Sequence, residues 1–313
     1  MIFNGGQKID KKDIKSVSLA LKNSLITSGP LVKEFEEKIK KYVNSKFALT
    51  CSSGTSAIHL AFEAINVSSG DVVIMPSINF ISSFNIAKLT RAKVYLTDVD
   101  NKTGQMTPKN LIDCIKKNNL KKIKAVITMY LGGSPEHISS FNSLKKKYKF
   151  FWIEDACHAF GSSYFYKKKY KVGSCKHADI STFSFHPLKT ITTGEGGAVT
   201  TNNNKFYIKM KNFRSQGLLA DRKFHWKYHR SGLGLNYRMN DIQCALGISQ
   251  LSKINSITKK RRNIAKNYDK LLSTIPSFVS IPKYDEKKVS SSHLYLVSIN
   301  FSKLKVKKDF LFK

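Results

Sequence analysis

The segment DISTFSFHPLKTITTGEGGAVTT (residues 179–201) places two short runs of β-branched and aromatic residues on either side of a glycine-rich turn. Residues 179–185 and 197–201 therefore predict two strands. The turn between them holds Lys189 among small and apolar residues, although lysine is abundant elsewhere in the chain. A solvated lysine needs no such surroundings, whereas a lysine amine that must lose its proton and attack a carbonyl does.

Four apolar residues flank this lysine: Phe183, Phe185, Pro187 and Leu188. Their side chains should desolvate the amine of Lys189 and lower its pKa. Ser184 could contact a phosphate, and the glycines after Lys189 allow a tight turn close to a ligand. A surface loop with a solvated lysine is the usual alternative, and the two strand-end motifs upstream make it the weaker one here.

Upstream of this segment, short apolar runs alternate with amphipathic ones. Strands are predicted at residues 47–51, 72–75, 93–97, 125–130 and 150–154. Helices are predicted at residues 10–25, 30–43, 55–65, 79–89, 108–117 and 137–147. The first of these carries an apolar stripe of Ile14, Val17, Leu21 and Leu25. This alternation predicts an α/β fold with a mainly parallel sheet between helices, and its functional site at the carboxyl ends of the strands.

The alternation changes after residue 180, and Pro276, Pro282 and the Ser-rich stretch VSSSH mark the boundary of a second, smaller domain. A helical pattern runs from Asp241 to Leu272 with little interruption, and residues 293–300 predict a strand. We therefore expect a large domain over residues 1–255 and the start of a small α+β domain over residues 256–313. One strand and part of a helix do not close a domain, so we expect this small domain to be incomplete.

The chain carries a formal net charge of +33, which is extreme for its 313 residues. A nucleic-acid-binding or anionic-surface protein is one interpretation. The other is codon bias, because lysine, asparagine and isoleucine are abundant, arginine is sparse and the lysines are spread along the chain. Five cysteines without a C-x-x-C pair, no signal peptide and no membrane-length apolar run predict a cytoplasmic protein with reduced thiols.

The segment CSSGTSAIHLA (residues 51–61) predicts a strand, a turn with Gly54 and hydroxyl side chains, and then a helix. Backbone amides at a helix N-terminus, together with Ser and Thr hydroxyls, suit a phosphate. The same residues also suit an ordinary helix cap. The segment alone supports both interpretations equally.

The segment FFWIEDACHAFGS (residues 150–162) ends an apolar strand with Glu154, Asp155 and His158. A carboxylate at this place is costly unless it has a cationic or hydrogen-bonding partner. Asp155 could hold a protonated pyridine nitrogen, which would make that ring a stronger electron sink. The alternatives are a helix-capping aspartate and, for His158, a hydrogen-bonded core histidine.

In GLNYRMNDIQCALGISQL (residues 234–251), Asn240 or Asp241 predicts a helix cap, and spacing alone gives Asn236 no role. Motifs of other enzyme classes are missing from the sequence. It contains no G-x-x-x-x-G-K-[ST] loop, no G-x-S-x-G elbow and no His/Cys cluster with metal-ligand spacing.

Taken together, the blocks VGSCKHADISTFSFHP, FSFHPLKTITTGEGGAVTTN, GLNYRMNDIQCALGISQL and SSSHLY resemble the DegT/DnrJ/EryC1/StrS family of nucleotide-sugar aminotransferases. The resemblance runs from about residue 5 to the end. It implies the aspartate-aminotransferase fold (fold type I), a three-layer α/β/α sandwich, with pyridoxal 5'-phosphate as cofactor. The sequence looks most like the branch that aminates a UDP-linked 4-keto-6-deoxy-N-acetyl sugar on the route to pseudaminic acid. That branch implies glutamate as amino donor and a homodimer with shared sites, without a nucleic-acid or membrane partner.

The resemblance also implies a role for individual residues. Lys189 matches the lysine that binds the cofactor covalently and moves the proton, and Asp155 matches the carboxylate that faces the ring nitrogen. Five further cofactor contacts are implied: Gly54, Thr55 and Ser184 at the phosphate, Phe80 stacked on the ring and His158 beside it. Asn236 matches a residue that reaches the cofactor and substrate of the neighbouring subunit, and Thr27 matches part of the substrate-binding turn.

Departures from the family pattern leave the substrate open. Residues 3–7 read FNGGQ where the family often has P-Y-G-R-Q, so the sugar is not determined. A perosamine-type or 3-keto sugar is the alternative within the class. A dehydrating branch of the family has histidine in place of the lysine, and Lys189 argues against that branch. Outside the class, the alternative is a basic nucleic-acid-binding or regulatory protein on the same fold.

Overall fold

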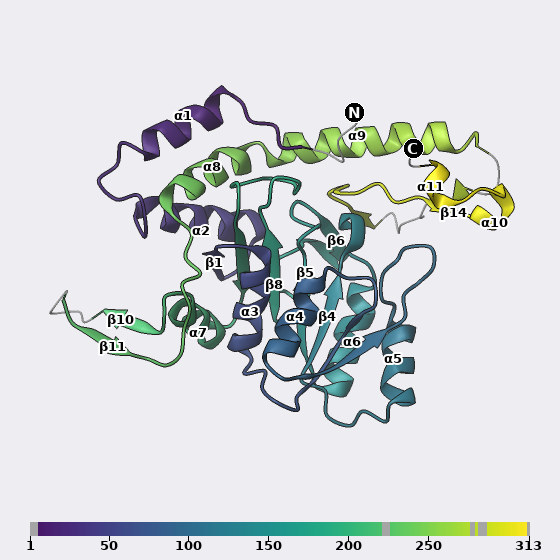
Figure 1. Cartoon of the computed structure of the whole chain (residues 1–313), viewed down its shortest axis with the longest axis horizontal. Helices are drawn as coiled ribbons and strands as arrows, with labels where there is room; N and C mark the ends of the chain where they lie inside the picture. Colours follow the sequence, from purple (N-terminus) through teal and green to yellow (C-terminus); the bar gives the residue numbers. More distant parts are fainter. Residues whose placement is uncertain (1–5, 221–225, 276–278, 281–286, 312–313) are drawn as a thin grey trace.

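The computed structural model describes residues 6–220, 226–275, 279–280 and 287–311, and a seven-stranded sheet forms its centre (Figure 1). In spatial order its strands are β1 (Phe47–Cys51), β9 (Gly197–Thr201), β8 (Ile180–Ser184), β5 (Phe151–Asp155), β4 (Ala125–Met129), β2 (Val72–Pro76) and β3 (Lys93–Thr97). β9 runs antiparallel to both of its neighbours, and the pairs from β8 to β3 are parallel. The predicted mainly parallel sheet is thus confirmed, with one strand reversed.

Helices cover both faces of the sheet. One face carries α3 (Gly54–Ala64), α4 (Ile81–Leu89) and α7 (Asn204–Arg214). The other carries α2 (Pro30–Val43), α5 (Pro108–Lys117), α6 (Ile138–Tyr148) and α8 (Asp241–Ser252). Successive strand residues alternate between the two cores, as Ala198 and Val199 of β9 do. The three-layer α/β/α sandwich of the fold type I class is therefore confirmed.

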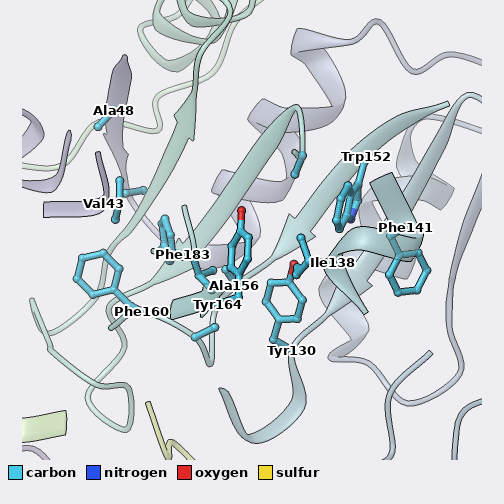
Figure 2. Close-up of a cluster of buried hydrophobic side chains, with 14 of the residues drawn as sticks. Val43, Ala48, Tyr130, Ile138, Phe141, Trp152, Ala156, Phe160, Tyr164 and Phe183 are labelled. Atoms are coloured by element: carbon cyan, nitrogen blue, oxygen red, sulfur yellow. The ribbon is translucent and has the colours of Figure 1, made fainter. Parts of the chain in front are cut away.

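Large aromatic side chains fill the core on the α6 side (Figure 2). Trp152 is fully buried, and its ring nitrogen donates to Thr128 Oγ1 at 2.8 Å. The Tyr130 hydroxyl donates to the buried carboxylate of Glu154 at 2.6 Å, and the Ser181 hydroxyl also donates to that carboxylate. These partners place Glu154 in the core, so Asp155 alone of the two neighbouring carboxylates belongs to the site described below.

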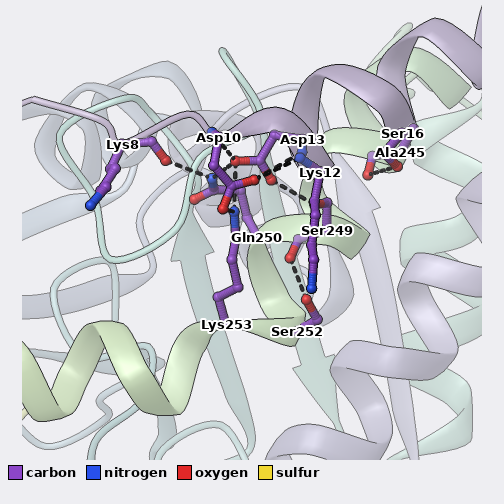
Figure 3. A network of polar contacts seen from close by, with 10 residues as sticks. All are labelled: Lys8, Asp10, Lys12, Asp13, Ser16, Ala245, Ser249, Gln250, Ser252 and Lys253. Carbon is purple, nitrogen blue, oxygen red and sulfur yellow. Dashed lines mark hydrogen bonds and ion pairs between the residues drawn. The ribbon is translucent and has the colours of Figure 1, made fainter.

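The two N-terminal helices behave differently. The apolar stripe of α2, at helical spacing, is buried: Val32, Phe35, Ile39 and Val43. The stripe of α1 (Lys11–Ala20) is not, since Ile14 is 59% exposed. α1 instead contacts α8 through polar side chains (Figure 3). Asp13 accepts hydrogen bonds from Ser249 at 2.6 Å and Gln250 at 2.8 Å, and pairs with Lys253 at 2.7 Å.

The C-terminal region departs most from the prediction. α9 (Ile254–Leu272) follows α8 after Lys253 alone, as predicted. The strand predicted at residues 293–300 is wrong in extent, because only β14 (Ser298–Ile299) is extended and pairs with β12 (Val279–Ser280). The amides of His293 and Leu294 bond instead to the Gly132 carbonyl, so these residues join a loop rather than a sheet. The domain division at residue 255 stays a prediction.

The remaining elements are short. They are η1 (Leu131–Gly133), β6 (Ser163–Tyr166), β7 (Lys168–Lys171), β13 (Lys288–Val289), α10 (Phe301–Leu304), α11 (Lys308–Leu311) and the hairpin strands β10 (Leu218–Ala220) and β11 (Tyr228–Arg230). The hairpin projects from the body of the molecule (Figure 1). Phe3 and Asn4, two of the residues that depart from the family pattern, lie outside the described residues. None of the described helices is long and apolar enough to cross a membrane.

Candidate active site

A cavity of about 800 Å³ lies where β5 and β8 end and α3 begins. Residues from distant parts of the chain line it, including Asp155 at the end of β5 and Lys189 after β8. Seven of the nine predicted site residues lie together in this lining: Gly54, Thr55, Phe80, Asp155, His158, Ser184 and Lys189. The cavity therefore lies at the carboxyl ends of parallel strands, where the sequence predicts the site.

Lys189 projects from the turn that joins β8 to β9. Its backbone N–H donates to the His186 carbonyl at 2.8 Å, which fixes the backbone of the turn. Phe183 and Phe185 are fully buried beside the turn, but Leu188 is exposed. Only part of the predicted apolar frame is therefore buried, and Lys189 itself is half-buried at the cavity wall.

Asp155 is 2% exposed and has few partners. One carboxylate oxygen accepts a hydrogen bond from the Cys157 backbone N–H at 3.1 Å. Burial raises the pKa of Asp155, while hydrogen bonds from Cys157 and the charge of Lys189 act in the opposite direction. A buried carboxylate with so little compensation is stabilised most by a cationic group in the cavity. A protonated ring nitrogen would be such a group.

The first turn of α3 brings a helix N-terminus to the cavity. The Ser53 hydroxyl accepts from the Ser56 N–H at 3.1 Å, and the Ser56 hydroxyl accepts from the Ser53 N–H at 2.9 Å. Within the described residues no acceptor contacts the amides of Gly54 and Thr55, so they remain at the positive end of the helix. The turn is thus both a helix cap and a place that fits a phosphate.

Gly54 allows this helix end to approach β8 closely. A Cβ atom on Gly54 would lie 2.9 Å from Ser184 Cβ and 3.3 Å from Cys157 Sγ. Ser184 is nearly buried and also lines the cavity. The hydroxyl of Ser184 and the amides of α3 therefore converge on the same end of the cavity.

Two histidines lie against each other in the cavity lining. The ring centroids of His158 and His293 are 4.3 Å apart, with an interplanar angle of 44°. Burial, assisted by the charge of Lys189, lowers the pKa of His158 to about 3. Burial, assisted by the neighbouring His158, Lys189 and Arg261, lowers the pKa of His293 to about 2. Both rings are therefore neutral at physiological pH. His158 Nδ1 has no hydrogen-bond partner among the described residues, which is not expected of the hydrogen-bonded core histidine of the alternative interpretation.

The other predicted residues occupy different positions. Phe80 directly precedes α4 and is 68% exposed at the cavity, which leaves a ring face available for stacking. Thr27 and Asn236 are exposed and are not among the described residues that line the cavity. Thr27 forms an isolated antiparallel bridge with Asn240, which caps α8 as predicted. Asn236 forms a similar bridge with Ser215, and these two residues flank the β10–β11 hairpin in the sequence.

Two walls of the cavity were not assigned from the sequence. One face of α9 contributes Arg261, Ile264, Ala265 and Tyr268, and a C-terminal segment contributes Ser292, His293, Leu294 and Tyr295. The spacing on α9 is visible in the sequence, but it is also the spacing of any helix face that packs on a core. The block SSSHLY contributed only to the family resemblance, which assigned no role to its residues.

The cavity residues fit pyridoxal phosphate. Asp155 supplies a buried carboxylate for a ring nitrogen, α3 and Ser184 supply donors for a phosphate, and Lys189 supplies an amine. The described residues contain no group of three His, Cys, Asp or Glu side chains arranged to hold a metal ion.

A reversed β9 in an otherwise parallel sheet, with a lysine in the β8–β9 turn and an aspartate at the end of β5, places the protein in the class of fold type I α/β enzymes. The chain belongs to the DegT/DnrJ/EryC1/StrS aminotransferase family, whose profile matches residues 7–312.

Three relatives illustrate this membership. The chain is 40% identical, over its whole length and 80% of the relative, to a UDP-4-amino-4,6-dideoxy-N-acetyl-beta-L-altrosamine transaminase of Campylobacter jejuni. It is 38% identical, over 84% of the chain and 69% of the relative, to a GDP-perosamine synthase of Escherichia coli O157:H7. The structure of Helicobacter pylori PseC, an aminotransferase in pseudaminic acid biosynthesis, superposes with a TM-score of 0.88 at 31% identity over 98% of this chain and 80% of that one.

Proposed function

We propose that this aminotransferase transfers an amino group from glutamate to the C4 keto group of a UDP-linked 4-keto-6-deoxy-N-acetyl sugar, with pyridoxal 5'-phosphate as cofactor. The observation that carries the proposal is the 40% identity, over the whole chain, to a transaminase named for that amino sugar. The cavity supports it, because Lys189, Asp155 and the α3 N-terminus line one space. A structure of Spr1654 from Streptococcus pneumoniae in its PLP form, 25% identical with a TM-score of 0.85, covers 96% of this chain and supports the choice of cofactor.

Each residue has a distinct task in this proposal. When bound, pyridoxal phosphate supplies an electron-withdrawing ring that stabilises negative charge at the carbon that loses its proton. Lys189 holds the cofactor, and its amine then takes the α-proton of the amino donor. Asp155 keeps the ring nitrogen protonated, because its buried carboxylate stabilises a cation beside it. Gly54, Thr55 and Ser184 hold the phosphate, while Phe80 stacks on the ring and His158 lies beside it.

We also propose a homodimer in which Asn236 reaches the site of the neighbouring subunit. Asn236 is exposed, forms a bridge with Ser215 just outside the β10–β11 hairpin, and is not among the described residues that line the cavity of its own chain. Exposed apolar side chains lie on and beside this hairpin, with Leu233 75% exposed. Such a surface is typical of a subunit interface. We propose that the enzyme is cytoplasmic, because nucleotide sugars are cytoplasmic substrates and because its five free cysteines are typical of a reducing compartment.

A perosamine-type reaction is the second candidate, and the 38% identity to a GDP-perosamine synthase favours it. The two differ in nucleotide and in the N-acetyl group of the sugar. The N-terminal segment is relevant to both, because Gly6 lines the cavity where the family often has arginine.

The test uses the purified protein loaded with pyridoxal phosphate. We expect a visible absorption band from the lysine-bound cofactor, and we expect this band to disappear when glutamate is added. UDP-linked 4-keto-6-deoxy-N-acetyl sugar should then restore the band and yield an amino sugar detectable by mass spectrometry. A GDP-linked 4-keto-6-deoxy hexose serves as the competing substrate. Restoration by the GDP sugar alone would overturn the substrate, and no band at all would overturn the cofactor.

A further inference from the structure

The C-terminal strap, which we define as Ser290–Tyr295, forms one wall of the cavity although it lies more than a hundred residues from Lys189 in the sequence. Its first half is fixed on neighbouring loops. The Ser291 N–H donates to Ser162 Oγ at 2.8 Å, and the Ser291 hydroxyl donates to the His158 carbonyl at 2.6 Å. The His293 N–H donates to the Gly132 carbonyl at 2.9 Å.

Arg261 of α9 connects this strap to the turn that carries Lys189. Its Nη1 donates to the His293 carbonyl at 3.3 Å and lies 3.5 Å from His293 Nδ1, and its Nη2 donates to the Lys189 carbonyl at 3.3 Å. No carboxylate pairs with Arg261 within the described part of the chain. A partly buried guanidinium among neutral acceptors is therefore held by the two carbonyls and the imidazole it bridges.

The contact with His293 determines which ring nitrogen carries the proton. A guanidinium stays protonated and has no acceptor atom, so the Nδ1 that faces it must offer a lone pair. A neutral imidazole with its lone pair on Nδ1 carries its proton on Nε2. The His293 ring, which lines the cavity beside His158, then offers one N–H donor and no positive charge.

We propose that Arg261 is a positioning residue that joins the Lys189 turn to the C-terminal strap and holds His293 as the neutral tautomer with its proton on Nε2. The consequence for catalysis rests on the proposed function. The Lys189 turn is also held by a hydrogen bond from the Lys189 N–H to the His186 carbonyl. Among the described residues, the His293 ring has a hydrogen-bond partner only in Arg261. The loss of Arg261 should therefore disturb the substrate-facing wall more than the lysine.

The first readout needs neither cofactor nor substrate. In the chain labelled with ¹⁵N-histidine, the His293 signals are assigned as those lost in His293→Gln. We expect the Nε2–H tautomer in the unmodified chain, and a mixture of tautomers in Arg261→Met. Arg262→Met is the matched control, because Arg262 also contacts the strap, at the Ser290 carbonyl, but neither His293 nor Lys189. A mixed tautomer in the unmodified chain, or no change in Arg261→Met, would overturn the assignment whatever the enzyme's substrate.

The second readout is steady-state kinetics with the keto sugar. Arg261→Met should lower kcat/KM about tenfold, as expected for the loss of one or two charge-assisted hydrogen bonds, and chiefly by raising KM. Arg261→Lys should recover little, because one ammonium cannot bridge two carbonyls and an imidazole as a planar fork does. Arg262→Met should retain values close to those of the unmodified chain. A fall in kcat with unchanged KM, or the same loss in Arg262→Met, would contradict the proposal.

Discussion

Replacement of Gly54 by alanine tests whether the close approach of α3 to β8 shapes the phosphate end of the cavity. The new Cβ would lie 2.9 Å from Ser184 Cβ, whereas carbon atoms pack at about 3.5–4.0 Å. The overlap is therefore roughly 0.6–1.1 Å. Ser184 cannot retreat easily, because β8 is an interior strand paired with β9 on one side and β5 on the other. The first turn of α3 must move instead.

The size of the effect follows from two opposing contributions. Overpacking of a close contact costs about 1–3 kcal/mol. Alanine in place of glycine in a helix returns up to about 1 kcal/mol. We expect a net loss of about 1 kcal/mol in the free energy of unfolding. Because the Gly54 and Thr55 amides move with the helix, we also expect pyridoxal phosphate to bind about tenfold more weakly.

The assay is a titration of the visible absorption band with cofactor, together with thermal unfolding of the cofactor-free protein. A double-mutant cycle with Ser184→Gly provides the control, since that change removes the Cβ with which the introduced methyl group would collide. The loss in the double variant should be smaller than the sum of the two single losses. Unchanged cofactor affinity in Gly54→Ala, or strictly additive losses, would refute the argument from close approach.

Three further substitutions test other parts of the molecule. Lys189→Ala should abolish transamination without lowering the unfolding temperature, because Lys189 is the one lysine among the described residues that line the cavity; retained turnover would contradict this. Asp155→Asn keeps the shape but removes the charge, so kcat should fall on the order of 100-fold while cofactor still binds, and an unchanged kcat would contradict the role of the carboxylate. Asp13→Asn should cost about 1–2 kcal/mol of unfolding free energy at pH 7, because it removes one of the two carboxylates that pair with Lys253 in Figure 3 and leaves Asp10 as the other. The pKa of Asp13 is lowered in the folded chain, against burial, by hydrogen bonds from Lys253, Ser249 and Gln250. Its stabilisation is therefore present above the unfolded pKa of about 3.9 and is lost as the pH falls through the folded value. Chemical denaturation at pH 7 and near pH 3 should show the difference between Asp13→Asn and the unmodified chain shrinking, and a difference independent of pH would contradict the argument.

Much of the fold could be predicted from the sequence because each element's pattern is local. The strand at residues 93–97 and the helix at residues 108–117 coincide with β3, a short run rich in β-branched and aromatic residues, and with α5, whose apolar residues recur at the period of a helix. The direction of β9 was also accessible in principle. Residues 185–196 contain Pro187 and two glycines, and no helical pattern that could cross the sheet between parallel strands, so an antiparallel β9 is the simpler pairing.

Other features depend on contacts that no local pattern contains. The stripe of α1 has the period of a buried helix face, yet Ile14 is exposed because Asp13 binds the polar side chains of α8. Residues 293–300 have the pattern of a strand, but the amides of His293 and Leu294 bond to the Gly132 carbonyl, 161 residues away from His293 in the sequence. Arg261 likewise meets the Lys189 carbonyl across 72 residues of sequence. Such pairings are decided by the packing of the whole chain.

The site itself shows how ambiguous motifs become one structure. β5 and β8 are parallel, and Asp155 pairs in register with Thr182. β8 therefore continues two residues past Asp155 to Ser184, which meets Gly54 at the start of α3. The chain then turns back through Lys189 into the antiparallel β9. The lysine therefore lies at the same edge of the sheet as Asp155, the last residue of β5. A cap, a buried aspartate and a lysine in a turn, each ordinary alone, share one cavity because a single reversed strand keeps them at the same end of the sheet.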